Sequence, residues 1–450
     1  MKCLTRLLCV VLLGSCLMAQ AADDVLFRVH GSNTVGAALA PACAREYLAS
    51  IGVANPRVKR AAADNEYEVY GRQGNRTVTI QIAAHGSGTG FTALAEGRAE
   101  IAMSSRPIKR EEALALRHLG NLRAPEAEQA VAIDGLAIIV HPDNPVAQLT
   151  VAQVAQVFAG HINNWQQLGG PDLPISLYAR DDKSGTWDTF SSLVLGKQWQ
   201  LSPAARRFES NDQLSDQVSS DRSAIGFVGL ASVRSARLLA IADSSTAAMQ
   251  PTPFTVATED YPLSRRLFFY VPQVSRSQAA AEYVAFCQSQ QGQDIVKRVG
   301  FVSQTIIAFD QPAPATAPAS YRKLAEHGRR LSVNFRFDQG SPQLDNKAWR
   351  DLSRIVDYMQ LPENRNARLY LVGFSEAGEA VSQDLLLSRY RALAVRGALL
   401  RDNVPVAASI GLGSMMPVAA NDRHDVRNKN GRVEVWQLDN LLVLDDIASR

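Results

Sequence analysis

The stretch Arg180-Asp181-Asp182-Lys183-Ser184-Gly185-Thr186 organises the interpretation of the whole chain. It follows a short apolar run at residues 175–178, which predicts a strand, and it precedes residues 187–195, which predict a helix. Ser184, Gly185 and Thr186 are therefore expected at a helix N-terminus, where free N–H groups and the helix dipole favour an anion. Arg180 adds a guanidinium that can donate two parallel hydrogen bonds to the same oxyanion. The stretch predicts an anion site at the junction of a strand and a helix.

Two similar clusters lie upstream, Gly31-Ser32-Asn33-Thr34-Val35-Gly36 and Gly86-Ser87-Gly88-Thr89-Gly90. Each stands between an apolar run and a helical pattern. If the three clusters converge, their N–H and hydroxyl dipoles form a cage around one tetrahedral anion. The repeated order of strand, Gly-rich turn and helix predicts an α/β sheet that binds its ligand at the carboxyl ends of the strands.

Length and charge limit the classes of protein to consider. With 450 residues the chain predicts two or three domains. Its 47 basic and 44 acidic residues give a net charge of +3, and the basic residues are not run together, so no nucleic-acid surface is predicted. The sequence contains no Gly-x-Ser-x-Gly elbow, His-Glu-x-x-His pair or P-loop. We therefore expect a protein that is not an enzyme and that holds neither a cofactor nor a metal.

The N-terminus is typical of a secretory signal peptide. Basic residues precede an apolar core at residues 7–13, and Ala19-Gln20-Ala21 is a small-x-small cleavage site, so residues 1–21 are expected to be removed on export. Leu13-Gly14-Ser15-Cys16 also resembles a lipoprotein cleavage box. Lipid anchoring at Cys16 therefore stays open as an alternative to simple cleavage.

Only Cys43 and Cys287 lie beyond the signal segment. Export to an oxidising compartment permits a disulfide between them. Both also stand in helical patterns with apolar neighbours, which favours two buried free thiols. The sequence leaves both alternatives open.

The order of elements divides the chain into segments. Residues 22–310 alternate strands and helices, including an apolar strand at 136–140, and predict two α/β lobes joined by crossover strands around a cleft. Residues 311–325 are rich in Pro and Ala and predict an extended linker of roughly 3.1 Å per residue. Residues 326–440 predict a small α/β domain, and residues 441–450 form a tail.

Two local expectations concern the lobes. The polar residues 55–75 predict an inserted loop or a hairpin. Residues 277–299 predict a single long helix that returns the chain to the first lobe.

The N-terminal 310 residues resemble the periplasmic phosphate-binding proteins of ABC importers. The resemblance rests on the three clusters above, on Ser104-Ser105-Arg106-Pro107, on residues 134–137 and 141–145, and on the turn Asn164-Trp165, all in the family's order. It implies a two-lobe periplasmic-binding-protein fold of the type II kind, with inorganic phosphate as the ligand. The positions expected to hold phosphate are Thr34, Val35 through its N–H, Ser87, Ser105, Arg180, Ser184, Gly185 and Thr186.

One of these positions departs from the family's pattern. Many members carry at position 105 an Asp that accepts the proton of hydrogen phosphate, and a carboxylate there rejects fully ionised sulfate. Ser105 can donate or accept a hydrogen bond. Phosphate stays the leading ligand, with weaker discrimination against sulfate expected.

The C-terminal part of the chain resembles the OmpA-like peptidoglycan-binding domain, through residues 373–378, 387–392, 411–413 and 430–434. That family holds the diaminopimelate of the wall peptide with an Asp and an Arg, which fall here on Glu376 and Arg391. The Asn before its helix falls on Asp384. Glu376 is one methylene longer than the family's Asp, and the usual Asn-Arg-Arg is Asn430-Gly431-Arg432. Peptidoglycan binding is the implied function, and a plain ion pair between Glu376 and Arg391 is the alternative.

Together these features predict a periplasmic binder of inorganic phosphate, held at the cell wall or the outer membrane for phosphate capture or sensing. The expected partners are phosphate, peptidoglycan and, as a further candidate, an ABC permease. The alternative is a wall-attached structural, adhesion or signalling protein whose phosphate-like module no longer serves transport.

Overall fold

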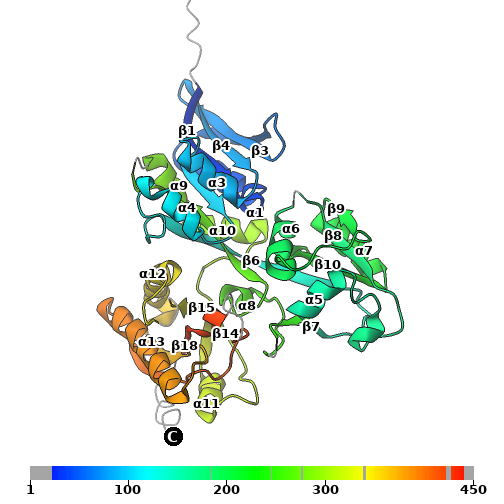
Figure 1. Ribbon diagram of the computed structural model, residues 1–450. Helices are drawn as coiled ribbons and strands as arrows, with labels where there is room; N and C mark the ends of the chain where they lie inside the picture. Colours follow the sequence, from blue (N-terminus) through cyan, green and yellow to red (C-terminus); the bar gives the residue numbers. More distant parts are fainter. Residues whose placement is uncertain are drawn as a thin grey trace, which may run out of the picture.

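The computed structural model describes residues 23–182, 184–244, 246–274, 277–337, 341–421 and 427–439. The predicted signal peptide with Cys16, and the predicted tail at 441–450, lie outside the described residues. Figure 1 shows two α/β lobes, coloured blue to green, and a smaller unit below them in yellow to red. The prediction of a two-lobe α/β fold followed by a small α/β domain is confirmed.

The first lobe carries one half of the main sheet, with the strand order β2-β3-β4-β1-β5. Its strands are β1 (Asp23–Gly31), β2 (Ala54–Arg60), β3 (Glu66–Gln73), β4 (Arg76–Ala84) and β5 (Ile101–Ser104). Its helices are α1 (Asn33–Gly36), α2 (Leu39–Ser50), α3 (Ser87–Ala95), α4 (Arg110–Ala115), α9 (Gln278–Gln288) and α10 (Gln290–Val299). The polar stretch predicted as a loop or a hairpin forms the antiparallel pair β2 and β3, so the hairpin alternative is correct.

The second lobe extends the same sheet with the order β10-β8-β9. Its strands are β7 (Gln148–Thr150), β8 (Ser176–Arg180), β9 (Arg206–Phe208), β10 (Ala224–Gly229), β11 (Arg237–Leu238) and β12 (Ala240–Ala242). Its helices are α5 (Val151–Phe158), α6 (Gly185–Phe190), α7 (Asn211–Ser220) and α8 (Pro253–Ala257).

Two long strands carry the sheet from one lobe to the other. The first half of β6 (Glu128–Val140) pairs with β13 (Ser264–Tyr270), and its second half pairs with β10. Every residue of β6 after Glu128 is buried, and all of these except Gln129 and Asp134 are apolar or glycine. These are the predicted crossover strands, and a change in the angle between the lobes has to bend them.

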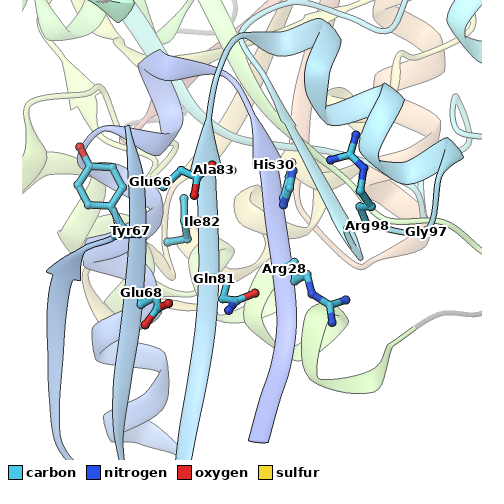
Figure 2. A pocket seen from close by; sticks show the side chains of 11 residues that line it. Arg28, His30, Glu66, Tyr67, Glu68, Gln81, Ile82, Ala83, Gly97 and Arg98 are labelled. Atoms are coloured by element: carbon cyan, nitrogen blue, oxygen red, sulfur yellow. The ribbon is translucent and has the colours of Figure 1, made fainter. Parts of the chain in front are cut away.

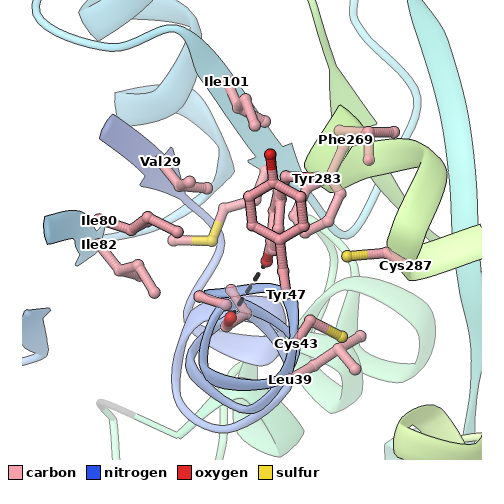
Figure 3. Packing of buried hydrophobic residues seen from close by; sticks show 14 of the residues in the cluster. Val29, Leu39, Cys43, Tyr47, Ile80, Ile82, Ile101, Phe269, Tyr283 and Cys287 are labelled. Atoms are coloured by element: carbon pink, nitrogen blue, oxygen red, sulfur yellow. Dashed lines mark hydrogen bonds between the residues drawn. The ribbon is translucent and has the colours of Figure 1, made fainter. Parts of the chain in front are cut away.

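The core of the first lobe encloses both cysteines of the described chain. Figure 3 shows Cys43 and Cys287 beside Tyr47 and Tyr283 in this cluster. Both thiols are buried and free. Burial raises the pKa of the Cys287 thiol, and its contact with Cys43 raises it further. The sequence leaves a disulfide and two free thiols as alternatives, and the structure has the two free thiols.

The prediction of one helix over residues 277–299 is wrong, because the helix breaks at Ser289. The hydroxyl of Ser289 accepts a hydrogen bond from Gly292 N–H over 3.3 Å and so starts α10. A Cβ at Gly292 would lie 2.2 Å from Phe286 O, so the sharp bend requires glycine. Apolar periodicity continues through the break, and it alone does not reveal the new start.

The C-terminal unit is a five-stranded sheet with the order β14-β15-β18-β16-β17 among the described residues. Its elements are β14 (Ala308–Phe309), α11 (Ala319–His327), β15 (Arg329–Arg336), α12 (Asn346–Gln360), β16 (Arg368–Gly373), α13 (Val381–Arg401), β17 (Val406–Gly411) and β18 (Arg432–Leu438). Helices α12 and α13 pack an apolar cluster on one face of the sheet, and α11 packs a second cluster on the other face.

Part of the segment that connects the lobes to the C-terminal unit packs against that unit. Strand β14 pairs with β15 through Ala308 and Phe309. Ala317, in the Pro/Ala-rich stretch, is buried in the cluster beneath α11. The domain limits drawn from the sequence stay a prediction.

One centre of the contact between the C-terminal unit and the lobes is a buried carboxylate, Asp260, which is 3% exposed. Arg330 Nη2 and Arg336 Nη2, both on β15, donate to its Oδ2 and Oδ1 over 2.8 and 3.0 Å. Asn334 of the same strand donates to Asp260 Oδ1 over 2.9 Å and to Thr258 O over 3.0 Å. Three donors from one strand therefore end on a single turn of the second lobe.

A second ion cluster surrounds the neighbouring residue, Glu259. Its two carboxylate oxygens each lie 2.9 Å from Arg266 Nε. Arg266 Nη1 donates to Asp345 in the C-terminal unit over 2.8 Å, and Lys347 Nζ lies 3.6 Å from Glu259. The backbone φ of Glu259 is 60°, a left-handed conformation that costs about 1–3 kcal/mol for a residue other than glycine. Such a conformation persists where its surroundings fix it, and the ion pairs of the Glu259 carboxylate with Arg266 and Lys347 are such surroundings.

The C-terminal unit contacts both lobes. Asn346 Nδ2 donates to Arg123 O over 2.9 Å and to Glu128 Oε1 over 3.2 Å in the first lobe. The N–H of Ala420 donates to Asp243 Oδ2 over 3.0 Å in the second lobe. A change in the angle between the lobes therefore has to alter contacts of this unit.

We predict that acid destabilises this interface over a defined pH range. Burial raises the pKa of Asp260, but Arg330 and its neighbours outweigh burial and hold that pKa at about 2, below the ordinary 3.8. The pKa of Glu259 is held at about 2, below 4.5, with burial again opposed first by Arg266. Such carboxylates stabilise the fold above their unfolded pKa and lose that contribution as the pH falls toward 2. The free energy of unfolding should fall by about 2 kcal/mol for each carboxylate over this range.

Urea unfolding followed by tryptophan fluorescence, from roughly pH 7 to pH 2, measures this loss. Asp260→Asn removes one titrating group and should flatten the pH dependence. Asp357→Asn, at an exposed position of α12, is the matched control and should follow the wild-type curve. An Asp260→Asn curve parallel to wild type would contradict the prediction.

Candidate anion site between the lobes

A cavity of about 710 Å³ opens between the two lobes. Its walls include residues that follow β1 in the first lobe and residues that follow β8 in the second, at the carboxyl ends of both strands. The predicted anion-binding residues among them are Thr34, Arg180, Ser184, Gly185 and Thr186. The structure therefore brings two of the three predicted clusters together.

Arg180 ends β8 and places a charge at the wall of this cavity. Its side chain is held by Nε, which donates to Phe208 O over 3.1 Å, and by Nη2, which donates to Glu209 O over 2.6 Å. Burial lowers the pKa of Arg180 and the nearby Asp181 raises it. A guanidinium nevertheless stays charged in proteins. Its position is therefore fixed before any anion arrives.

Ser184 caps the helix that starts at this wall. Its Oγ accepts hydrogen bonds from Thr186 N–H over 3.2 Å and from Trp187 N–H over 3.4 Å. The side chain thus serves as the N-cap of α6 in this structure. An entering anion would compete with this cap for the same N–H groups.

The two lobes touch at Thr34 and Gly185. Thr34 Oγ1 donates a hydrogen bond to Gly185 O over 3.0 Å. A Cβ at Gly185 would lie 2.3 Å from Thr34 Cα and 2.6 Å from Thr34 N, so only glycine permits this approach.

Arg265 and Asp134 support this contact, and neither was predicted from the sequence as a site residue. Arg265 Nη2 donates to Thr34 Oγ1 over 2.6 Å and to Gly185 O over 3.0 Å. Asp134 lines the cavity, and its Oδ2 accepts from Arg265 Nε over 3.3 Å and from Thr189 Oγ1 over 3.0 Å. Asp134 stands in a segment that carries the family resemblance, which was the available signal. Arg265 lies on a crossover strand without any Gly/Ser cluster to mark it.

Ser87 and Ser105 pair with each other outside this cavity. Ser105 N–H donates to Ser87 Oγ over 3.1 Å, and the two hydroxyl oxygens lie 3.3 Å apart. Ser87 lines a neighbouring cavity of about 690 Å³, and neither serine lines the cavity between the lobes. Val35 is fully buried in α1 and does not line it either. The structure leaves these three predicted residues outside the group around Arg180.

Another cavity, of about 490 Å³, lies on the first lobe alone. Figure 2 shows Arg28 and His30 of β1, Glu66 and Glu68 of β3, and Arg98 around it. Burial lowers the pKa of His30, and the charge of Arg98 lowers it further. None of the predicted anion-binding residues lines this cavity. Within the described chain, no group of three His, Cys, Asp or Glu side chains is arranged to hold a metal ion.

In the C-terminal unit, Glu376 and Arg391 form a bidentate ion pair. Arg391 Nη1 lies 2.9 Å from Glu376 Oε2, and Nη2 lies 3.2 Å from Oε1. The Arg391 side chain is 0% exposed and also donates to Phe374 O and Ser341 O over 3.2 and 3.1 Å. Protein groups therefore occupy the guanidinium, as the ion-pair alternative expects.

The extra methylene of Glu376 fits because residue 431 is glycine. A Cβ at Gly431 would lie 2.5 Å from Glu376 Oε1 and 2.6 Å from Arg391 Nη1. The two departures from the family's pattern, Glu in place of Asp at position 376 and Gly in place of Arg at position 431, therefore compensate each other, because the smaller residue makes room for the longer one. Asp384 is buried apart from this pair and accepts from Gly378 N–H over 3.0 Å and from Ser414 Oγ over 2.8 Å.

Comparison with known proteins agrees with the fold of both parts of the chain. A model of the PBP superfamily domain matches residues 56–316, more than half of the chain. The chain belongs to the PBP superfamily. A model of the OmpA family matches residues 336–431. Both resemblances stated from the sequence are confirmed.

The relatives of this PBP-superfamily chain include phosphate-binding proteins. Protein SphX of Synechococcus elongatus is 31% identical over 239 residues, which cover 51% of this chain and 70% of SphX. Phosphate-binding protein PstS of Pseudomonas aeruginosa is 31% identical over 242 residues, which cover 50% of this chain and 74% of PstS. A solved possible phosphate-binding protein from Planctomyces limnophilus is 26% identical, with a TM-score of 0.50 over 63% of this chain and 93% of that one.

We predict that Gly185→Ala holds the lobes apart, because its Cβ meets the backbone of Thr34 at 2.3 Å. The radius of gyration from small-angle X-ray scattering should rise while the circular dichroism spectrum stays unchanged.

The matched control is Gly88→Ala at the start of α3, where a Cβ meets nothing within 4 Å. Identical scattering from the two variants would show that the contact between Thr34 and Gly185 does not govern the lobe angle.

Proposed function

We propose that this protein is an exported, non-enzymatic binder of inorganic phosphate that closes its two lobes on the anion. The cavity between the lobes carries the proposal, since Thr34 from one lobe and Arg180, Ser184, Gly185 and Thr186 from the other line it together. The relatives named as phosphate-binding proteins support the choice of anion.

The chemistry of the lining suits a tetrahedral oxyanion. The start of α6 offers a favourable dipole end, and the hydroxyls of Ser184 and Thr186 can donate hydrogen bonds. The Thr34 hydroxyl and the N–H groups of Thr186 and Trp187 can join them once they leave their present partners, Gly185 O and Ser184 Oγ. Arg180 supplies a charge-assisted pair of hydrogen bonds, which are about twice as strong as neutral ones. Because the guanidinium is already fixed by Phe208 O and Glu209 O, phosphate does not have to order it on binding.

Calorimetry with the full chain tests the ligand. Wild type should release or absorb heat with inorganic phosphate, and Arg180→Ala should bind about ten-fold more weakly or worse, because it loses a charge-assisted pair. The same experiment with sulfate measures how strongly the protein prefers phosphate over sulfate. We expect this preference to be weak because residue 105 is Ser and not Asp.

Arg222→Ala is the control for a general loss of positive charge, since Arg222 lies in the same lobe with 78% of its side chain exposed. A wild-type chain that gives no heat with phosphate would overturn the proposed ligand. Equal affinities of the two arginine variants would remove Arg180 from the site.

We also propose that the OmpA-family domain holds the protein at peptidoglycan in the periplasm. The match over residues 336–431 supports this. A wall peptide would first meet Glu376, which keeps 10% of its side chain exposed, with Arg391 behind it. Across the described residues, no helix combines the length and apolarity needed to cross a membrane.

Sedimentation with purified peptidoglycan tests wall binding. Glu376→Gln should lower the fraction of protein that is retained, because it removes the charge that faces the wall peptide. Glu379→Gln, at an exposed position of the same loop, should be retained like wild type. Equal retention of both variants would make Glu376 and Arg391 a structural ion pair only.

The alternative function is a wall-attached structural, adhesion or signalling protein. The buried ion pairs between the lobes and the C-terminal unit favour it, because a binder fixed at the wall does not diffuse freely to a permease. Uptake of labelled phosphate by a deletion strain separates the two functions. Unchanged uptake supports the alternative, and reduced uptake supports phosphate capture with a permease partner.

A further inference from the structure

We propose that the phosphate cavity and the Glu376–Arg391 pair are coupled through the hinge, so that the C-terminal domain sets how tightly the lobes close on phosphate. This proposal rests on the proposed phosphate function of the cavity. It adds a regulator to that function, namely the contact surface between the C-terminal domain and strand β13.

Two neighbouring arginines of β13 contact different parts of the molecule, one the cavity and the other the C-terminal domain. Consecutive side chains of a strand point to opposite faces. Arg265 contacts the cavity wall, where it donates to Thr34 and Gly185. Arg266 contacts the C-terminal domain, where Nη1 donates to Asp345 over 2.8 Å. A displacement of β13 therefore changes both sets of contacts at once.

From Asp345 the contacts continue to the Glu376–Arg391 pair. Asp345 directly follows a short segment that begins at Ser341. In this segment Leu344 forms an isolated β-bridge with Phe337, the residue after β15. The carbonyl of Ser341 accepts a hydrogen bond from Arg391 Nε over 3.1 Å. A ligand that draws Arg391 toward itself has to release Ser341 and so disturb the segment that positions Asp345.

Coupling needs an element whose conformation both sites can shift, and here that element is the hinge that sets the angle between the lobes. The phosphate cavity and the C-terminal domain both contact it. The C-terminal domain contacts the first lobe through Asn346 and the second through Ala420. All of these contacts exist in a structure in which Thr34 of one lobe touches Gly185 of the other. They therefore favour this arrangement of the lobes, and a change in the lobe angle has to alter some of them.

Coupling of this kind is reciprocal and changes affinity by about five-fold to 150-fold. Loss of the contacts between the C-terminal domain and the lobes should weaken phosphate binding, although none of these residues lies in the cavity. Phosphate should in turn change the affinity of the C-terminal domain for its own ligand.

Calorimetry with inorganic phosphate on the full chain tests the coupling in two variants. Asp345→Asn removes the charge that faces Arg266 but keeps a good N-cap for α12, whose Ala348 N–H donates to Asp345 over 2.8 Å. Asn346→Ala removes the contacts with the first lobe. Each should weaken phosphate binding about five-fold or more, and Asp357→Asn on the exposed face of α12 should bind like wild type.

The outcomes separate this proposal from the proposed function. Absence of phosphate binding in wild type would defeat the function itself. Wild-type binding with equal affinity in Asp345→Asn, Asn346→Ala and the control would overturn the coupling and leave the function intact. As a second readout, saturating phosphate should change sedimentation with peptidoglycan in wild type, and the change should shrink in Asp345→Asn.

Discussion

The position of two adjacent guanidiniums on one crossover strand constrains the rest of the molecule. Arg265 joins the lobes at the cavity, and Arg266 joins the C-terminal domain. Each guanidinium is largely shielded from solvent, with 8% of the Arg265 and 17% of the Arg266 side chain exposed, and is compensated by its own carboxylate, Asp134 at 3.3 Å and Glu259 at 2.9 Å. Because an uncompensated buried charge costs several kcal/mol, both carboxylates have to stay in place whenever β13 moves.

The interface with the C-terminal domain relies on charge where an apolar contact could give equal stability. Replacing a buried ion network by well-packed apolar residues is often neutral or stabilising. The network instead fixes orientation, because Arg330, Asn334 and Arg336 all donate hydrogen bonds to one turn, at Thr258 and Asp260. The domain is therefore held in one orientation relative to the hinge, which a smooth apolar surface would not ensure.

The sequence predicts those features that have local causes. The two-lobe order and the strand–turn–helix context of residues 180–186 follow from apolar runs and Gly/Ser clusters, and the structure contains both. The break at Ser289 was missed because the apolar period continues across it. Arg265 was missed because its partner Thr34 lies 231 residues away, and no local pattern carries such a contact. The separation of Ser87 and Ser105 from the cavity depends on how the lobes pack, which local patterns do not encode.

Strand β14 has a practical consequence for dividing the chain. It lies before the Pro/Ala-rich stretch, yet it forms the outer edge of the C-terminal sheet. A fragment cut where the composition changes would take this strand away and expose the N–H and C=O groups of β15, a feature that promotes edge-to-edge aggregation. It would also leave Phe309 with the lobes, where its ring lies 5.0 Å from that of Phe254. Strand β14 therefore ties the two halves of the chain together, and a cut between them would remove an edge strand from the C-terminal sheet.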